Sequence, residues 1–170
     1  MKLGFVSAIL DGWNFEEVID TAAQFGYSCV EVACWPQGNA ERRYAGVSHI
    51  DVENLDDDQA KHILNYCMNK GVEISSLAFY PNPLDPNPEK QHTTIEHLKK
   101  VIFASSKLGI NLVTTFIGRD QNKNVEENLE LFKTTWPPII AFAEEHGVRV
   151  AIENCPMLFG QDQWPGGQNL

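Results

Sequence analysis

The residues best suited to chemistry stand near the end of the sequence, where Glu153 and Asn154 follow the run Val148–Ile152. Four of the five residues in that run are apolar and three of these are β-branched, which is typical of a strand buried on both faces. In parallel α/β sheets, ligands bind at the carboxyl ends of the strands. A carboxylate placed there needs a metal, another cation or a substrate donor group to offset its loss of solvation.

Glu153 has two interpretations at this point. In the first it is a ligand in a functional site. In the second it belongs to the scaffold, where it caps a neighbouring loop or pairs with a Lys or Arg side chain. The elements that position Glu153 decide between these interpretations.

A repeated pattern runs through the chain: a glycine, two further residues and then an apolar strand. It begins at Gly26, Gly71, Gly109 and Gly147, with spacings of 45, 38 and 38 residues. Each spacing is about one βα unit, so we predict four βα units and a fifth strand in a parallel sheet with right-handed crossovers. Two architectures fit this prediction, a doubly wound sheet of five strands and the first five strands of a (β/α)8 barrel. No strand is followed by a Gly-x-Gly-x-x-Gly or Walker-type loop, which disfavours the nucleotide-binding versions of the first.

The predicted strands cover residues 2–8, 29–33, 72–79, 112–117 and 148–152. Helices are predicted to begin at Asn14, where Glu17 completes a capping box, and after the acidic run Asp56–Asp58. Two longer helices follow, over residues 89–108 and 125–146. Within the last of these, Pro137 and Pro138 predict a kink or a division into two short helices.

Size and composition exclude several classes of protein. The 170 residues suit one domain, which we assign to residues 1–170. A net charge of −10 argues against a protein that coats nucleic acid. No segment is apolar enough over a membrane-spanning length, and the amino terminus lacks the pattern of a signal peptide. The four cysteines form no Cys-x-x-Cys pair, so we expect a cytoplasmic protein with reduced thiols.

With these elements in place, the sequence resembles the xylose-isomerase-like barrel superfamily, which includes sugar phosphate isomerases/epimerases and endonuclease IV-like proteins. The matching segments are Leu3-Gly4-Phe5, Phe25–Glu31, Leu108-Gly109 and Glu145–Asn154, of which the last is the specific one. The resemblance implies an α/β fold, a TIM (β/α)8 barrel of which this chain carries about the first five strands.

The resemblance also implies a metal site. In this family the Glu that ends strand five is a ligand of a divalent metal (Mn²⁺, Mg²⁺, Co²⁺ or Zn²⁺), and the other ligands come from strands six to eight. Only Glu153 can therefore be assigned, as metal ligand and catalytic residue. Ketose 3-epimerases of the group carry a second Glu six residues later, where this sequence has Phe159. The broad family is indicated more firmly than that narrow activity.

Several residues are candidates for contact with a substrate. Trp13 and Trp35 follow the first two strands, where an aromatic ring can stack on a sugar or simply pack against the rim. Asn82 lies in the loop after strand three, and Asn154 stands beside the expected metal ligand. Glu31 lies inside strand two, where a structural salt bridge and a substrate contact are equally compatible with the sequence.

The leading hypothesis is therefore a metal-dependent isomerase or epimerase of a small-molecule sugar or sugar phosphate, acting by proton transfer through an enediolate. Two alternatives remain open: a non-catalytic half-barrel that binds a ligand or partner, and a dehydratase or lyase on the same barrel. No nucleic-acid or membrane partner is expected. Because five strands leave two open sheet edges, we expect a homo-oligomer.

Overall fold

The computed structural model describes residues 1–38 and 46–153, so Asn154 and Phe159 lie outside the described residues. Its sheet has five parallel strands in the order β1-β2-β3-β4-β5. The strands are β1 (Gly4–Val6), β2 (Cys29–Ala33), β3 (Glu73–Ala78), β4 (Leu112–Thr115) and β5 (Arg149–Ile152). The helices are a 3-10 turn η1 (Ser7–Ile9), α1 (Phe15–Gln24), α2 (Asp57–Lys70), α3 (Pro88–Lys107) and α4 (Val125–Glu145).

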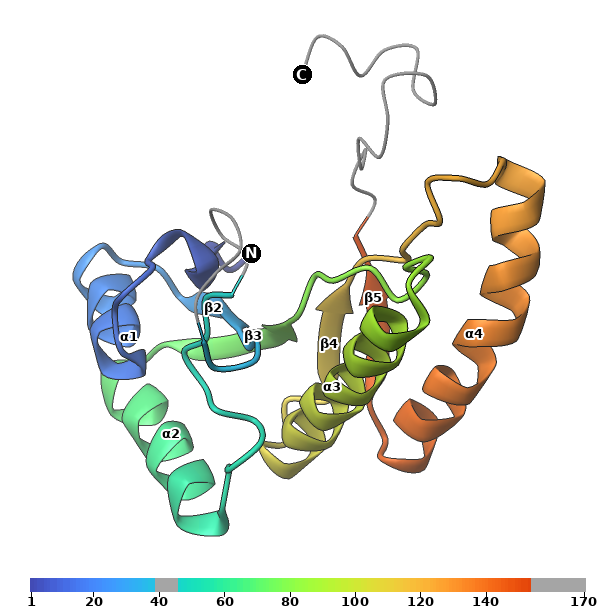
Figure 1. The fold of residues 1–170 in the computed structure, drawn as a ribbon. Coiled ribbons are helices and arrows are strands. Elements are labelled where there is room, and N and C mark those ends of the chain that lie inside the picture. Colours follow the sequence, from blue (N-terminus) through green and yellow to red (C-terminus); the bar gives the residue numbers. More distant parts are fainter. Residues whose placement is uncertain (39–45, 154–170) are drawn as a thin grey trace, which may run out of the picture.

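Consecutive strands are neighbours throughout the sheet, which is the arrangement of a barrel and not of a doubly wound sheet. When every crossover has the same hand and joins adjacent strands, all the helices lie on one side of the sheet. The helices surround the outer side of the curved sheet accordingly (Figure 1). We call the other side the inner face. The prediction of the first five strands of a barrel is therefore confirmed.

The core lies between the sheet and the helices. Its side chains come from the outward-facing strand positions and from the inward stripes of the helices, and they include Val30, Val32, Leu77, Leu98, Ile102, Val113 and Trp136. Burial of such side chains is the main favourable term in folding. The helix that follows β1 begins as predicted, with a capping box in which Asn14 and Glu17 each accept the other's backbone N–H.

A β-bulge interrupts the pairing of β2 with β3. Val30 pairs with Ile74 and Glu31 pairs with Ser76, so Ser75 is the extra residue. Beyond it, Leu77 faces the helices, as Ile74 does on the other side of the bulge. Ser76, Ala78 and Tyr80 then take the alternate positions, which lie on the inner face.

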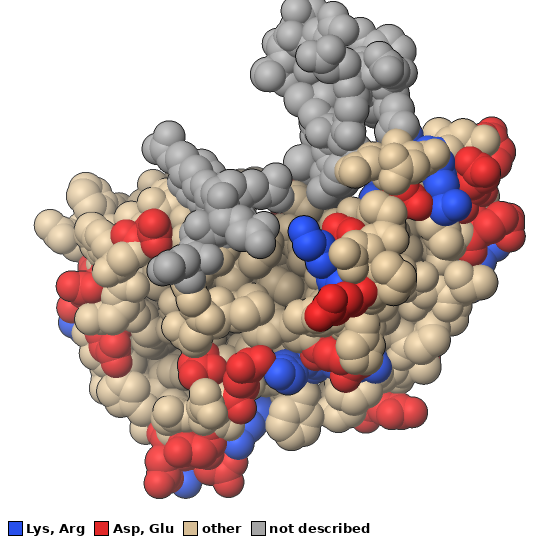
Figure 2. Space-filling view, viewed as in Figure 1, with Lys and Arg blue, Asp and Glu red and all other residues tan. Residues whose placement is uncertain are grey.

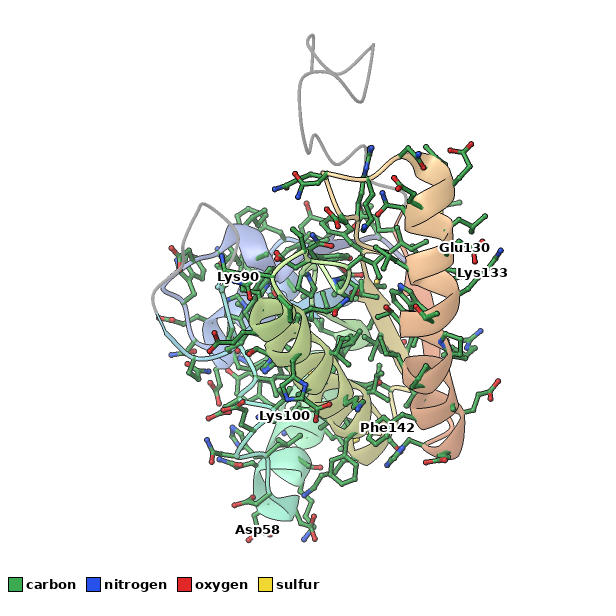
Figure 3. All side chains as sticks on the ribbon, turned by 45° about the vertical axis from the view of Figure 1, so that its right-hand side comes forward. Asp58, Lys90, Lys100, Glu130, Lys133 and Phe142 are labelled. Carbon is green, nitrogen blue, oxygen red and sulfur yellow. The ribbon has the colours of Figure 1, made fainter. Side chains whose placement is uncertain are left out.

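Of the two outcomes expected at Pro137 and Pro138, the division of the last helix into two is wrong, because α4 runs unbroken through both residues. Each proline removes one helical N–H donor, yet the flanking side chains Trp136 and Ile139 are each only 1% exposed. The Trp136 indole N–H also donates to the Ile117 carbonyl at 2.9 Å. Packing on both sides of the proline pair holds the helix together. On the outer side of α4, Lys133 pairs with Glu130 one turn earlier (Figure 3).

The first strand is shorter than predicted because residues 7–9 form the turn η1. The Ser7 hydroxyl is fully buried, accepts the Ala33 N–H at 2.8 Å and lies 2.9 Å from His49 Nδ1. His49 Nε2 lies 3.1 Å from the Leu10 carbonyl, which can only accept, so Nε2 carries the proton and donates. Nδ1 is then the unprotonated nitrogen and accepts a hydrogen bond from the Ser7 hydroxyl. His49 thus ties the loop after β2 to the end of β1 in its neutral form.

This arrangement predicts a loss of stability in mild acid. Burial lowers the pKa of His49 below its ordinary value of 6.5, although the Leu10 carbonyl and the charge of Asp11 oppose the shift. The unfolded chain then binds more protons below about pH 6.5, so the free energy of unfolding falls as pH is lowered, by at most about 1.4 kcal/mol per pH unit. Urea unfolding between pH 7 and pH 5 measures this. H49Q should flatten the pH dependence, whereas H92Q, at an exposed histidine of α3, should not; equal slopes would contradict the assignment.

Both edges of the sheet carry exposed apolar side chains. Leu3 and Val6, at the β1 edge, are 68% and 39% exposed, and Ile152 of β5 is 42% exposed. Unpaired strand edges with apolar side chains favour association. On the face shown in Figure 2, charged side chains of both signs are interspersed, with an acidic group over α2. None of the helices within residues 1–38 and 46–153 is long and apolar enough to cross a membrane.

We predict that the protein self-associates through these edges. Sedimentation velocity should show a weight-average mass that rises with concentration. L3K or V6K should lower that mass, because a lysine blocks edge pairing. M68K, which replaces an equally exposed apolar side chain on α2, should leave it unchanged. A monomer at every concentration would refute the prediction.

Candidate functional site

Three side chains share one level of the inner face at the carboxyl ends of the strands. Ala78, Thr114 and Ala151 are paired across β3, β4 and β5, and the residues two positions further on are Tyr80, Phe116 and Glu153. The ladder continues past the strand ends, since the Phe79 and Glu153 N–H groups donate to the Thr114 and Thr115 carbonyls. The rings of Tyr80 and Phe116 are 4.7 Å apart. We call Tyr80, Phe116 and Glu153 the inner row.

Glu31 joins this group from β2. Its carboxylate accepts the Ser76 hydroxyl at 2.8 Å and a short hydrogen bond from the Tyr80 hydroxyl. Of the two readings left open by the sequence, a structural salt bridge is not what the structure shows: within the described residues Glu31 forms no ion pair. Its partners are neutral hydroxyl groups.

Tyr80 lies between two carboxylates. Burial raises its pKa first, and the hydrogen bond to Glu31 raises it further, while a hydrogen bond with Thr114 acts in the opposite direction. The charges of Glu31 and Glu153 also raise it. Tyr80 therefore stays protonated, and its hydroxyl donates its one hydrogen bond to Glu31. The phenolic oxygen can still accept a hydrogen bond, and it is close enough to Glu153 for that charge to affect the pKa of Tyr80.

Glu153 stands exposed at the end of β5, held by the backbone hydrogen bond to Thr115 at 2.9 Å. No Lys or Arg of the described residues pairs with its carboxylate, which disfavours the scaffold interpretation. An unpaired carboxylate oxygen is a suitable ligand for a divalent cation. It supplies one ligand only: no group of three His, Cys, Asp or Glu side chains converges anywhere in residues 1–38 and 46–153.

The predicted substrate-binding residues separate into two places. Trp35 and Asn82 line one cleft of about 770 Å³ between the loop after β2 and the start of α3. Its apolar wall is formed by Trp35 and Phe79, whose rings are 5.0 Å apart. Trp13 does not line this cleft; it is 44% exposed in the loop after η1. Asn154, the fourth candidate, is outside the described residues.

Asn82 also joins two of the loops at the carboxyl end of the sheet. Its side-chain oxygen accepts the Arg119 N–H at 2.8 Å and the Leu84 N–H at 3.1 Å, and its amide nitrogen donates to the Arg119 carbonyl at 2.8 Å. Gly118 permits this close approach. It has φ +82°, and an added Cβ would lie 2.6 Å from Asn82 Oδ1. Most of the hydrogen-bonding capacity of Asn82 is thus used within the chain.

We predict that G118A is strongly destabilising. The left-handed backbone alone costs an alanine about 1–2 kcal/mol, and the clash with Asn82 and the Leu84 nitrogen adds about 1–3 kcal/mol. G147A is the matched control, since Gly147 has φ +66° with open space around the added Cβ. Urea denaturation should give a free energy of unfolding that falls more for G118A than for G147A. Equal losses would show that the two loops adapt to a Cβ.

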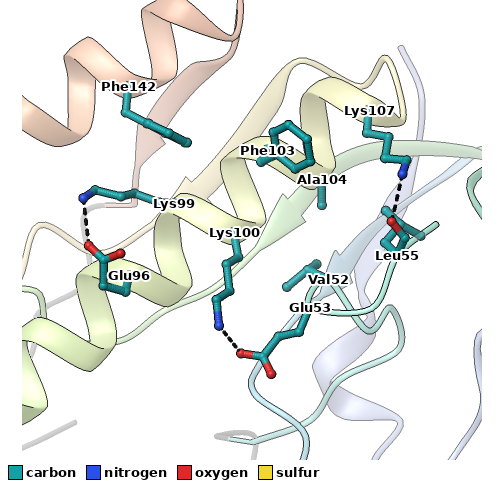
Figure 4. A pocket seen from close by; sticks show the side chains of 10 residues that line it. All are labelled: Val52, Glu53, Leu55, Glu96, Lys99, Lys100, Phe103, Ala104, Lys107 and Phe142. Carbon is teal, nitrogen blue, oxygen red and sulfur yellow. Dashed lines mark hydrogen bonds and ion pairs between the residues drawn. The ribbon is translucent and has the colours of Figure 1, made fainter. Parts of the chain in front are cut away.

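A second cleft, of about 380 Å³, lies on the outer surface between α3, α4 and the loop before α2 (Figure 4). Its three lysines are all paired. Lys99 contacts Glu96 at 2.8 Å, Lys100 contacts Glu53 at 2.5 Å and Lys107 contacts Asp57 at 2.8 Å. These contacts neutralise the lysines, so the cleft has no free cation for an anionic ligand. It is remote from the carboxyl ends of the strands.

Comparison with known proteins assigns the family. The sequence profile described as Xylose isomerase-like TIM barrel matches residues 19–166, which is most of the chain. The chain belongs to this family. No curated protein sequence matches it significantly.

Solved structures of the family share its fold. D-psicose 3-epimerase from Clostridium cellulolyticum H10, solved with D-tagatose, has a TM-score of 0.64 at 16% identity, over 89% of this chain and 52% of its own. The probable 3-DHS dehydratase AsbF from Bacillus anthracis has a TM-score of 0.66 at 16% identity, over 92% and 53%. The IOLI protein, solved with a zinc atom, has a TM-score of 0.62 at 17% identity, over 89% and 51%. The chain spans about half the length of these xylose isomerase-like barrels.

Sequence reasoning missed the inward positions of Ser76 and Tyr80. A signal for them was present: the apolar residues of the third strand are Val72 and Ile74, then Leu77 and Phe79. The spacing of three between Ile74 and Leu77 breaks the period of two and marks the bulge. Strict alternation from Val72 would have placed Ser76 and Tyr80 on the helix side.

Proposed function

We propose that this protein takes part in a metal-dependent isomerase or epimerase reaction on a sugar or sugar phosphate. The observation that supports it most is the position of Glu153, a carboxylate at the carboxyl end of the last described strand of a xylose isomerase-like barrel, which pairs with no Lys or Arg of residues 1–38 and 46–153. Structural neighbours include an epimerase solved with D-tagatose and a protein solved with zinc. These neighbours support the class of reaction without fixing the substrate.

Each of the chain's own groups has a defined part in this proposal. Glu153 would hold one face of a divalent cation, which when bound polarises a carbonyl and favours loss of a proton from the neighbouring carbon. The Tyr80 oxygen and the Glu31 carboxylate present hydrogen-bond acceptors beside it. Phe116 and Tyr80 form an aromatic wall next to Glu153. The remaining metal ligands and the proton-transfer groups are not among these residues.

A dehydratase on the same barrel is the second candidate. AsbF matches the fold as closely as the epimerase does. Phe159 replaces the second Glu that ketose 3-epimerases are expected to carry. Both reactions begin with removal of a proton next to a carbonyl, so a cation held at Glu153 would serve both in the same way.

We predict that E153Q weakens the binding of Mn²⁺ while the fold survives. Replacing the charged ligand by an amide should weaken Mn²⁺ binding by roughly 10–100-fold or more, and an exposed side chain should cost less than about 0.5 kcal/mol of stability. Isothermal titration calorimetry with Mn²⁺ measures the first quantity and urea unfolding the second. E145Q is the control, since Glu145 is exposed at the opposite end of the same βα unit.

The outcomes separate the candidates. Equal Mn²⁺ affinity of E153Q and the wild type would remove Glu153 from the ligand set and with it the proposal. Where Mn²⁺ binding does depend on Glu153, turnover of ketoses or their phosphates identifies an isomerase or epimerase. Loss of water from a hydroxy-keto acid identifies the dehydratase instead.

A further inference from the structure

Glu31 is a carboxylate in the middle of a strand, on the inner face and partly buried. A buried carboxylate that serves only the scaffold is usually paired with a cation, because hydroxyl groups alone compensate poorly for lost solvation. Here Ser76 and Tyr80 are its hydrogen-bond donors, and no Lys or Arg of residues 1–38 and 46–153 pairs with it. Among the described residues, its charge is therefore oriented by hydroxyl groups and not neutralised by a cation.

Within residues 1–38 and 46–153, the carboxylate keeps unused acceptor positions. Two carboxylate oxygens offer about four lone-pair sites, and Ser76 and Tyr80 occupy one on each oxygen. Both donors come from the β3 side. On the β1 side, Val6 is the residue paired with Glu31, and its side chain has no hydrogen-bond donor. Because Glu31 is only partly buried, its remaining sites are open to a ligand on the inner face.

Tyr80 links Glu31 to the inner row. Its hydroxyl donates to Glu31, and the charges of both Glu31 and Glu153 act on it. The two carboxylates therefore lie on the same face, separated by one aromatic side chain. A single small molecule held at Glu153 has Glu31 on the same face, two levels deeper in the sheet, because Glu31 pairs with Ser76, four residues before Tyr80.

We infer that Glu31 is a specificity-determining residue, whose carboxylate accepts hydrogen bonds from the hydroxyl groups of a polyhydroxylated substrate. This inference rests on the proposed function, because Glu153 would anchor the reacting end of that molecule. Ser76 and Tyr80 hold the carboxylate in the orientation required. An acceptor site of this kind selects sugars over deoxy analogues, which leave the carboxylate unpaired.

Binding measurements on the full chain test the inference. The probes are Mn²⁺ alone, and then D-tagatose, D-fructose and fructose 6-phosphate in the presence of Mn²⁺, titrated by calorimetry. E31Q keeps the shape of the side chain and removes its charge. It should weaken binding of the sugar by about tenfold or more, the size expected for a lost hydrogen bond to a charged group. The affinity for Mn²⁺ should not change.

E73Q is the matched control. Glu73 is an exposed carboxylate on the same sheet, at the amino-terminal end of β3, where it pairs with Lys2. The same chemical change there should alter neither affinity. Should E31Q unfold, Y80F provides the second test, because it keeps the ring against Phe116 and removes the hydroxyl that orients Glu31. Y80F should also weaken sugar binding with Mn²⁺ affinity unchanged.

Three results would overturn the inference: sugar affinity of E31Q equal to that of the wild type, an equal loss in E73Q, or no sugar binding by a wild type that holds Mn²⁺ through Glu153. The last result leaves the metal site intact. Conversely, sugar binding that depends on Glu31 but not on Glu153 or Mn²⁺ supports the inference and refutes the proposed function.

Discussion

The whole arrangement depends on one constraint: each strand hydrogen-bonds in parallel to the strand that follows it in the chain. Parallel neighbours require a crossover, and crossovers of one hand place every helix on the same side. The apolar outward positions of the strands are thereby covered, and the inward positions are left to other uses. The same constraint brings all carboxyl ends to one edge, which is why residues as distant in sequence as Glu31 and Glu153 act on the same tyrosine.

Different interactions stabilise the two faces of the sheet. The helix side is stabilised by burial of aliphatic side chains such as Val30, Val32 and Leu77, none of which carries a polar atom in its side chain. The inner face carries hydroxyl and carboxyl groups that satisfy one another only in part. Tyr80 connects these polar residues, because it donates to Glu31 and its pKa is raised by the charge of Glu153. The rigidity of the first face is what allows the second to keep unused acceptors in fixed positions.

Local signals predicted the elements well. The capping box of Asn14 and Glu17 and the glycines that end the helices act over a few residues, and the structure has both. Pro137 and Pro138 do not divide the last helix, because burial of Trp136 and Ile139 outweighs the local preference.

The site was harder to predict, since its contacts join distant segments. No periodic pattern in the sequence indicates the hydrogen bonds of Asn82 with Arg119 or of Glu31 with Tyr80. Glu153 could be proposed from the sequence because a strand end can be read locally. Which side chains of β3 face inward could not be read locally, because this depends on how β3 pairs with β2.

The bulge at Ser75 has a consequence for how this chain tolerates changes in length. Removing one residue from a strand normally turns every later side chain to the opposite face. At Ser75 the opposite holds: Ile74 and Ser76 already pair with the consecutive residues Val30 and Glu31. Deleting Ser75 would leave a regular ladder with Leu77 still facing the helices and Tyr80 still facing inward. The middle of β3 is therefore a position where relatives can differ by one residue and keep the same site.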